Sequence, residues 1–216
     1  RGDGVVTYQG LIVDFGGVLT TPLQDAFVAF AEVMGIELQD LVRVALKAYT
    51  DEDDPLVVSF EKGKLGEAEF SIHFAQRLAQ ETGVEVDPER LVQRLFGAMR
   101  LEEGMFDAVV AVKASGRKTA LLSNSWGVSS YPRERLAEVM DVIVISGEVG
   151  MRKPDREIFD HTVAELGLVP GSCVFVDDHP GHLKAAREVG LKTVLHRSPA
   201  ETIEELENLF DVKVTA

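Results

Sequence analysis

This chain of 216 residues shows no long apolar segment and no pattern of an export signal, and it contains a single cysteine. No apolar run reaches about eighteen residues, so no segment is predicted to cross a membrane as a helix. The first ten residues have neither the apolar stretch nor the cleavage pattern of a signal peptide, and we expect a cytoplasmic protein. The single cysteine, Cys173, cannot form a disulfide within the chain, and the apolar run 173–176 predicts a buried strand position for it.

Positive charge is also scarce. The chain has 22 Lys and Arg residues against 36 Asp and Glu residues, which gives a formal net charge of −14 at pH 7. Proteins that bind nucleic acid through its phosphates use a basic surface, so we expect no nucleic-acid partner. The same negative charge repels a small anionic substrate. A phosphate site must therefore supply its own positive charge from a cation, a lysine or backbone amides.

Five short runs of apolar or β-branched residues alternate with helical patterns over most of the chain. The runs are typical of buried strands and cover residues 11–13, 119–122, 142–145, 173–176 and 193–195. The helical patterns cover residues 105–114, 155–166 and 180–189, and each ends close to a glycine that suits a left-handed cap. This alternation predicts a parallel sheet wrapped by helices, in which ligands gather at the carboxyl ends of the strands.

The segment from about residue 20 to residue 100 breaks this alternation. It shows helical periodicity in 24–34, 40–48, 67–81 and 88–99 and no strong strand signal. We therefore expect a helical insertion between the first strand and the rest of the sheet. The predicted organisation is a catalytic core made of residues 1–19 and 101–216, with residues 20–100 as a cap that acts as a lid.

Polar residues that suit phosphate chemistry follow the predicted strands in four groups. The groups are Asp14, Ser123 with Asn124, Lys153 within the segment 150–154, and Asp177 with Asp178. Together they supply a carboxylate nucleophile, hydroxyl and amide donors, a fixed cation, and further carboxylates for a metal. One Asp at a strand end is typical of a turn or a helix cap. The ordered set of four points instead to phosphoryl transfer.

These groups lie in four stretches, residues 11–19, 121–126, 149–154 and 174–180, which resemble the four motifs of the haloacid-dehalogenase superfamily in order. The resemblance extends from about residue 11 to residue 197. It is strongest to the branch that contains the N-terminal phosphatase domain of soluble epoxide hydrolase and bacterial sugar-1-phosphate phosphatases. It implies an α/β fold with a doubly wound parallel sheet and an inserted helical cap, acting on a small phosphorylated metabolite.

The resemblance also implies roles for the residues that would face the substrate. Asp14 would attack phosphorus and form a phospho-aspartate. Ser123 and the Asn124 amide would hold phosphoryl oxygens. Lys153 would neutralise charge on both Asp14 and the phosphoryl group. The implied enzyme is a hydrolase of phosphoric monoesters, whose substrate and oligomeric state the sequence does not specify.

The implied cofactor is Mg²⁺. Asp178 would bind the ion together with the Asp14 carboxylate, the main-chain carbonyl of Gly16 and water molecules, because Mg²⁺ favours few carboxylates and retains water. Asp177 would orient the groups around the ion. An alternative is a transition-metal site in the stretch 177–182, where His179 and His182 flank the aspartates.

Gly16 departs from the family pattern. The usual first motif has an Asp two residues after the nucleophile as general acid and base, and this chain has Gly16 there. Three interpretations remain: a phosphatase with water or another residue as proton shuttle, a catalytically idle binding or sensing protein, and a dehalogenase. A phosphatase without this acid should favour substrates with good leaving groups.

Three further features have simpler interpretations. We expect Arg152 to be a solvated neighbour of the site rather than a ligand. The stretch 61–64 is interpreted as a structural turn of the cap. Trp126 is equally consistent with stacking on a substrate ring and with packing at the cap hinge.

Overall fold

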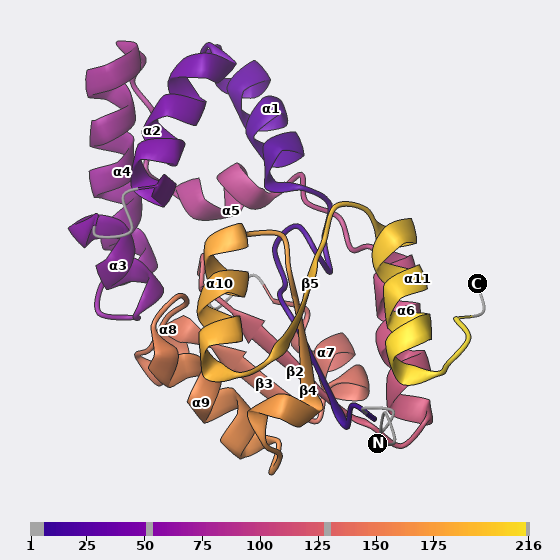
Figure 1. Cartoon of the computed structure of the whole chain (residues 1–216). Helices are drawn as coiled ribbons and strands as arrows, with labels where there is room; N and C mark the ends of the chain where they lie inside the picture. The colour runs from indigo at the N-terminus through magenta and orange to yellow at the C-terminus, as the bar shows by residue number, and fades with distance from the viewer. Residues whose placement is uncertain (1–6, 51–53, 128–130, 215–216) are drawn as a thin grey trace.

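The computed structural model describes residues 7–50, 54–127 and 131–214, with the backbone alone for residues 45–50. A sheet of parallel strands in the order β3-β2-β1-β4-β5 lies at the centre of the described part (Figure 1). The strands are β1 (Gly10–Val13), β2 (Lys118–Ser123), β3 (Val142–Ile145), β4 (Cys173–Asp177) and β5 (Lys192–Leu195). Each agrees with a predicted run to within one residue at either end.

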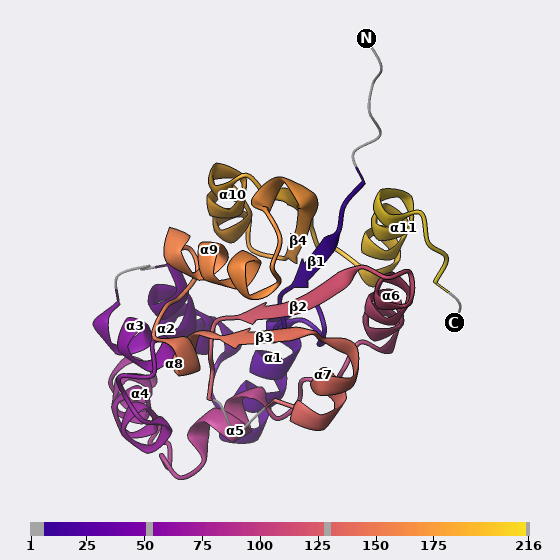
Figure 2. The same cartoon turned by 90° about the horizontal axis from the view of Figure 1, so that it is seen from below.

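Helices cover both faces of the sheet (Figure 2). They are α6 (Glu103–Ala114), α7 (Arg133–Val139) and α11 (Pro199–Phe210) on one face, and α9 (Arg156–Glu165) and α10 (Pro180–Val189) on the other. Leu11 and Val13 pack into the first hydrophobic cluster and Ile12 into the second, because successive strand residues point to opposite faces. The prediction of a doubly wound parallel sheet is confirmed. Cys173 is fully buried in the second cluster, as predicted.

Several short elements were not predicted from the sequence. They are α3 (Pro55–Glu61), α7, the single turn α8 (Ser146–Val149) and the 3₁₀ turn η2 (Pro170–Ser172). Each has seven residues or fewer, too few to show a hydrophobic period clearly. Among the described residues, no helix is long and apolar enough to cross a membrane.

The first five helices of the described part follow β1 in the chain and gather above the sheet in Figure 1. They are α1 (Leu23–Met34), α2 (Leu38–Thr50), α3 (Pro55–Glu61), α4 (Glu67–Thr82) and α5 (Leu91–Phe96). Their apolar side chains form a hydrophobic cluster of their own, which includes the stacked rings of Phe60, Phe70 and Phe74. Helix α5 is shorter than predicted, since Arg90 adopts a left-handed conformation directly before it.

The two segments that connect these helices to the sheet run side by side. Thr20 and Leu101 form an antiparallel bridge. The Thr21 N–H donates to the Arg100 carbonyl at 2.8 Å, and the Arg100 N–H donates to the Thr21 hydroxyl at 3.1 Å. The helices α1–α5 are thus connected to the sheet through one paired neck, directly beyond the carboxyl end of β1.

Candidate active site

Asp14 directly follows β1, and the register of the sheet places it between two neighbouring strand ends. Val13 pairs with Leu121 of β2 and with Val176 of β4. The Asp14 N–H donates to the Val176 carbonyl at 2.9 Å. Ser123, the last residue of β2, and Asp177, the last residue of β4, therefore flank Asp14 at one edge of the sheet.

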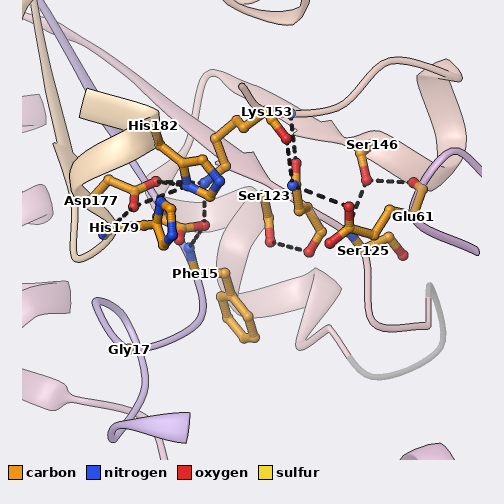
Figure 3. A network of polar contacts seen from close by, with 12 residues as sticks. Phe15, Gly17, Glu61, Ser123, Ser125, Ser146, Lys153, Asp177, His179 and His182 are labelled. Carbon is orange, nitrogen blue, oxygen red and sulfur yellow. Dashed lines mark hydrogen bonds and ion pairs between the residues drawn. The ribbon is translucent and has the colours of Figure 1, made fainter. Parts of the chain in front are cut away.

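Lys153 is a buried cation placed between two carboxylates. Its Nζ lies 2.9 Å from Asp14 Oδ1 and 2.7 Å from Asp177 Oδ2 (Figure 3), and its side chain is 0% exposed. Burial alone lowers the pKa of a lysine, but the two carboxylates outweigh it and raise the pKa of Lys153. The ammonium group is thus held charged beside Asp14.

Asp14, Asp177 and Asp178 bring carboxylate oxygens within 4.8 Å of one another, and among the described residues this group could hold a metal ion. Burial raises the pKa of Asp14 to about 7, with Asp177 and Asp178 adding to the effect and Lys153 opposing it. Asp178 reaches solvent, yet desolvation by the surrounding protein and the charge of Asp177 raise its pKa to about 6. Asp177 behaves oppositely: despite its burial, Lys153 and His182 lower its pKa.

Gly17 permits the close approach of Asp178 to the loop after β1. Gly17 has φ +73°, and a Cβ atom there would lie 2.4 Å from Asp178 Oδ2. A side chain at this position would therefore be strained and would displace the carboxylate. The neighbouring Gly16 differs, since a Cβ atom there would meet only Met99 Cε within 4 Å, at 4.0 Å, and its φ is not positive.

Ser123 is positioned by a residue that the sequence did not single out. Its hydroxyl lies 2.9 Å from the Tyr131 hydroxyl, and both side chains are buried. The Tyr131 ring packs at 4.8 Å from the Phe15 ring, in the loop after β1. Burial raises the pKa of Tyr131, so its hydroxyl stays protonated and can donate or accept a hydrogen bond. Residues 128–130, which precede it, lie outside the described part.

The Asn124 side chain holds the backbone of Lys153. Its Nδ2 donates to the Lys153 carbonyl at 2.9 Å, and its Oδ1 accepts from the Lys153 N–H at 2.8 Å. Nδ2 also lies 3.4 Å from Glu61 Oε2, at the end of helix α3. The Asn124 side-chain amide is thus engaged with the protein, and the structure links it to Glu61, which the sequence interpretation treated only as part of a turn.

Arg152 is not a solvated neighbour, so that expectation was wrong. Its Nε lies 2.6 Å from Glu61 Oε2, and the side chains are 11% and 4% exposed. Burial raises the pKa of Glu61 to about 7, while Arg152 opposes the shift. The Glu61 carbonyl accepts from Ser146 Oγ at 2.5 Å, and Ser146 also accepts from the Ser125 N–H (Figure 3). Helix α3 is therefore fastened to the sheet edge.

His182 contacts Asp177. Its Nδ1 lies 3.1 Å from Asp177 Oδ2, and its ring lies 4.4 Å from the His179 ring (Figure 3). Burial and the nearby Lys153 lower the pKa of His182, so the ring is neutral at pH 7. Within the described residues neither histidine joins the carboxylate group that could hold a metal, which gives no support to a transition-metal site in this stretch.

A cavity of about 170 Å³ opens onto these groups. Its base contains Asp14, Ser123, Asn124, Lys153 and Asp178. The helical segment α1–α5 and the linker after it supply Leu23, Phe96 and Met99, and the sheet side supplies Phe15, Trp126 and Tyr131 among others. The Trp126 ring lies 5.1 Å from Phe96, so it both lines the cavity and packs against the inserted helices.

Comparisons with known proteins show the family and agree with the fold. A family model described as haloacid dehalogenase-like hydrolase matches residues 8–190. The chain belongs to this family. The hydrolase is 32% identical over 126 residues to bifunctional epoxide hydrolase 2 of Rattus norvegicus, covering 55% of this chain and 23% of that protein. It thus spans about a quarter of the length of the epoxide hydrolases that it matches.

Two relatives match the hydrolase over nearly their whole length. D-ribitol-5-phosphate phosphatase of Bacteroides thetaiotaomicron is 26% identical over 208 residues, covering 92% of this chain and 96% of that protein. A crystal structure of a haloacid dehalogenase-family enzyme from the same species, in complex with magnesium and inorganic phosphate, superimposes with a TM-score of 0.64 at 20% identity. That match covers 88% of this chain and 94% of the other and supports the fold.

Proposed function

We propose that this hydrolase is a cytoplasmic, Mg²⁺-dependent phosphatase that acts on a small phosphorylated metabolite through a phospho-aspartate on Asp14. One observation carries the proposal: the Asp14 carboxylate lies at the base of a cavity, 2.9 Å from a fully buried lysine ammonium. The nucleophile and a fixed positive charge are thus held in one place, as phosphoryl transfer requires. The ribitol-phosphate phosphatase matched over 92% of the chain supports the same reaction class.

The residues present fit Mg²⁺. The carboxylate group consists of oxygen ligands, which Mg²⁺ prefers, and no histidine or cysteine belongs to it among the described residues. Burial and, after it, the like charges of the neighbouring carboxylates raise the pKa values of Asp14 and Asp178, and a bound divalent cation would relieve the repulsion between these charges. We propose Asp14, Asp178 and the Gly16 carbonyl as ligands. When bound, the ion would withdraw negative charge from the phosphoryl oxygens.

We propose the following roles for the chain's own groups in the two chemical steps. An Asp14 oxygen forms a bond to phosphorus as the bond from phosphorus to the alcohol oxygen breaks. The alcohol oxygen leaves with the bonding electron pair and takes a proton from water, because Gly16 has no carboxylic acid to supply one. Lys153 neutralises charge on the transferred group, and we propose that the Ser123 hydroxyl and the Asn124 main-chain amide donate to its oxygens. Water then attacks phosphorus and gives up a proton to solvent as the bond from phosphorus to the Asp14 oxygen breaks, which releases phosphate and regenerates the Asp14 carboxylate. Asp177 holds Lys153 from its other side.

We also propose that residues 20–100 form the cap over a core of residues 1–19 and 101–216. The paired neck at Thr20 and Leu101 supports boundaries at these positions. Leu23 and Phe96 support a role over the site, because they line the same cavity as Asp14. A cap in this place excludes bulk water from the phosphoryl group and selects the alcohol.

The site gives less support to the two alternatives, a dehalogenase and a catalytically idle binding or sensing protein. A halide leaving group needs a cation near the cap, but the lining residues that the structure describes include no arginine. The first arginine after Asp14, Arg43, pairs with Asp40 and has a side chain that is 60% exposed. A protein that only binds its ligand could use Lys153 but would not need a carboxylate nucleophile beside it, and this buried charge pair is costly to maintain.

A screen of phosphorylated metabolites with and without Mg²⁺, run in parallel on wild type and Asp14→Asn, tests the proposal. We expect Mg²⁺-dependent phosphate release by wild type and none by Asp14→Asn with its fold intact by circular dichroism. Equal release by both proteins would refute the role of Asp14. Binding of phosphorylated compounds without any release would favour the idle scaffold.

A further inference from the structure

The cavity that receives the substrate is apolar where the alcohol part would lie. Leu23, Phe96 and Met99 line it from the helical side, and Phe15 and Trp126 line it from the sheet side. The charged side chains lie at its base, where the phosphoryl group would bind. The two ends of the cavity therefore differ sharply in polarity.

We infer that the alcohol of the natural substrate is small and apolar, about the size of one ring or a short branched alkyl chain. This inference rests on the proposed phosphatase function and adds the substrate class to it. A cavity of about 150 Å³ with apolar walls accommodates benzene, and the cavity here measures about 170 Å³ including the base where the phosphoryl group would bind. A long lipid chain or a nucleotide is larger than this cavity.

Three polar side chains that line the cavity, Tyr131, Asn124 and His182, are already engaged with the protein, the last of them through Asp177. The Tyr131 hydroxyl bonds with Ser123, and the Asn124 side chain bonds with the Lys153 backbone. The hydroxyl groups of a sugar or a polyol would lose water and gain few partners among the described lining residues. Each unpaired hydroxyl is costly to bury, whereas a buried methylene is favourable.

The negative charge of the cavity also selects among substrates. Asp14 and Asp178 face the cavity, and Lys153, its one lysine or arginine among the described lining residues, is already shared between two carboxylates. A second phosphate or a carboxylate on the alcohol would meet negative potential without a free cation to offset it. The inferred substrate is therefore a monophosphate with no other charge.

A matched pair of primary alkyl phosphates separates polarity from leaving-group chemistry. We compare kcat/KM for 3-methylbutyl phosphate and D-ribitol 5-phosphate, both esters of primary alcohols, in the presence of Mg²⁺. Acetyl phosphate, which has almost no alcohol part, reports on the phosphoryl-transfer machinery alone. The expected preference for 3-methylbutyl phosphate is roughly 10- to 100-fold, the range that a few buried methylenes provide.

Substitutions of the apolar residues that line the cavity test whether these residues cause the preference. Met99→Gln and Leu23→Asn place a polar group in the apolar part and should reduce this preference about tenfold. Ile72→Gln is the matched control, because Ile72 lies on α4 with its side chain 46% exposed and does not line the cavity, so the preference should be unchanged.

The outcomes distinguish the two proposals. Turnover of acetyl phosphate with equal or better use of D-ribitol 5-phosphate would overturn the inferred substrate class and leave the phosphatase function standing. An unchanged preference in folded Met99→Gln and Leu23→Asn would also overturn it. No turnover of any of the three compounds would instead refute the phosphatase function.

Discussion

Glu61 Oε2 lies 2.6 Å from Arg152 Nε, and this ion pair joins the end of helix α3 to the residue next to Lys153. Glu61 also reaches Asn124, whose side chain holds both backbone groups of Lys153. The turn after helix α3 also approaches helix α8 closely at Gly63, where a Cβ atom would lie 2.1 Å from the Gly147 carbonyl oxygen. The inserted helices are thus fastened at the residues that position the buried cation.

Glu61→Gln should therefore affect both stability and activity. The substitution removes the carboxylate that pairs with the largely buried Arg152 Nε, and we expect a loss of roughly 3 kcal/mol in the free energy of unfolding by urea, the low end for breaking a buried pair. The activity should fall about tenfold or more, because small displacements of positioned groups are costly.

An exposed pair supplies the control for Glu61→Gln. Glu103 pairs with Arg135, and its side chain is 64% exposed. Glu103→Gln should change the free energy of unfolding by no more than about 0.5 kcal/mol. Equal effects of the two substitutions, or full activity in Glu61→Gln, would show that the contact between α3 and the loop of Lys153 does not support the site.

Much of the site can be predicted from the sequence, because its residues follow the ends of recognisable strands. The contact between Glu61 and Arg152 cannot be predicted in this way. Asp14, Ser123 and Asp177 each occupy the last or next position of a buried apolar run, so local pattern and parallel pairing place them together. Glu61 lies 91 residues before Arg152 in the chain. No local sequence pattern indicates that the end of helix α3 contacts the loop that contains Lys153. Tyr131 likewise follows no recognisable run and reaches Ser123 only through tertiary packing.

The Mg²⁺ requirement should depend on pH. The pKa values of Asp14 and Asp178 are raised to about 7 and about 6 without metal, so protons compete with the ion as the pH falls through this range. The Mg²⁺ concentration for half-maximal activity should rise by up to about tenfold per pH unit for each proton displaced. The measurement is activity against Mg²⁺ concentration at several pH values from 5.5 to 8.5, a range of about three units that covers both pKa values.

Asp178→Asn is the control for this titration. It should weaken Mg²⁺ binding at every pH and make the pH dependence shallower, because one of the competing carboxylates is gone. Full activity of wild type in excess chelator, or a Mg²⁺ requirement that does not change with pH, would contradict the assignment of these carboxylates to the metal.

Gly16→Asp should restore a proton donor to the leaving alcohol. Space for the side chain exists, since only Met99 Cε lies within 4 Å of the added Cβ atom, at 4.0 Å. General acid catalysis is typically worth about 10² to 10⁴ in rate, and it helps poor leaving groups most. The variant should therefore raise turnover of a primary alkyl phosphate more than that of an aryl phosphate.

Gly17→Ala is the neighbouring control, and it should lower activity toward both substrates because its Cβ atom would displace Asp178. An unchanged ratio of the two rates in folded Gly16→Asp would show that another group already supplies the proton. His182 lines the cavity and contacts Asp177, which makes it the next position to substitute in that case.

The account depends most on the covalent bond between Asp14 and phosphorus. Acid quenching during turnover of an aryl phosphate with Mg²⁺, followed by mass spectrometry of peptides, measures it directly. Without a general base at Gly16, hydrolysis of the intermediate should be slow enough for it to accumulate. We predict one added phosphoryl group on the peptide that contains Asp14, removed by hydroxylamine as an acyl phosphate is, and absent from Asp14→Asn. Steady turnover with the phosphoryl group on another residue, or with none trapped on Asp14 at any quench time, would contradict the mechanism.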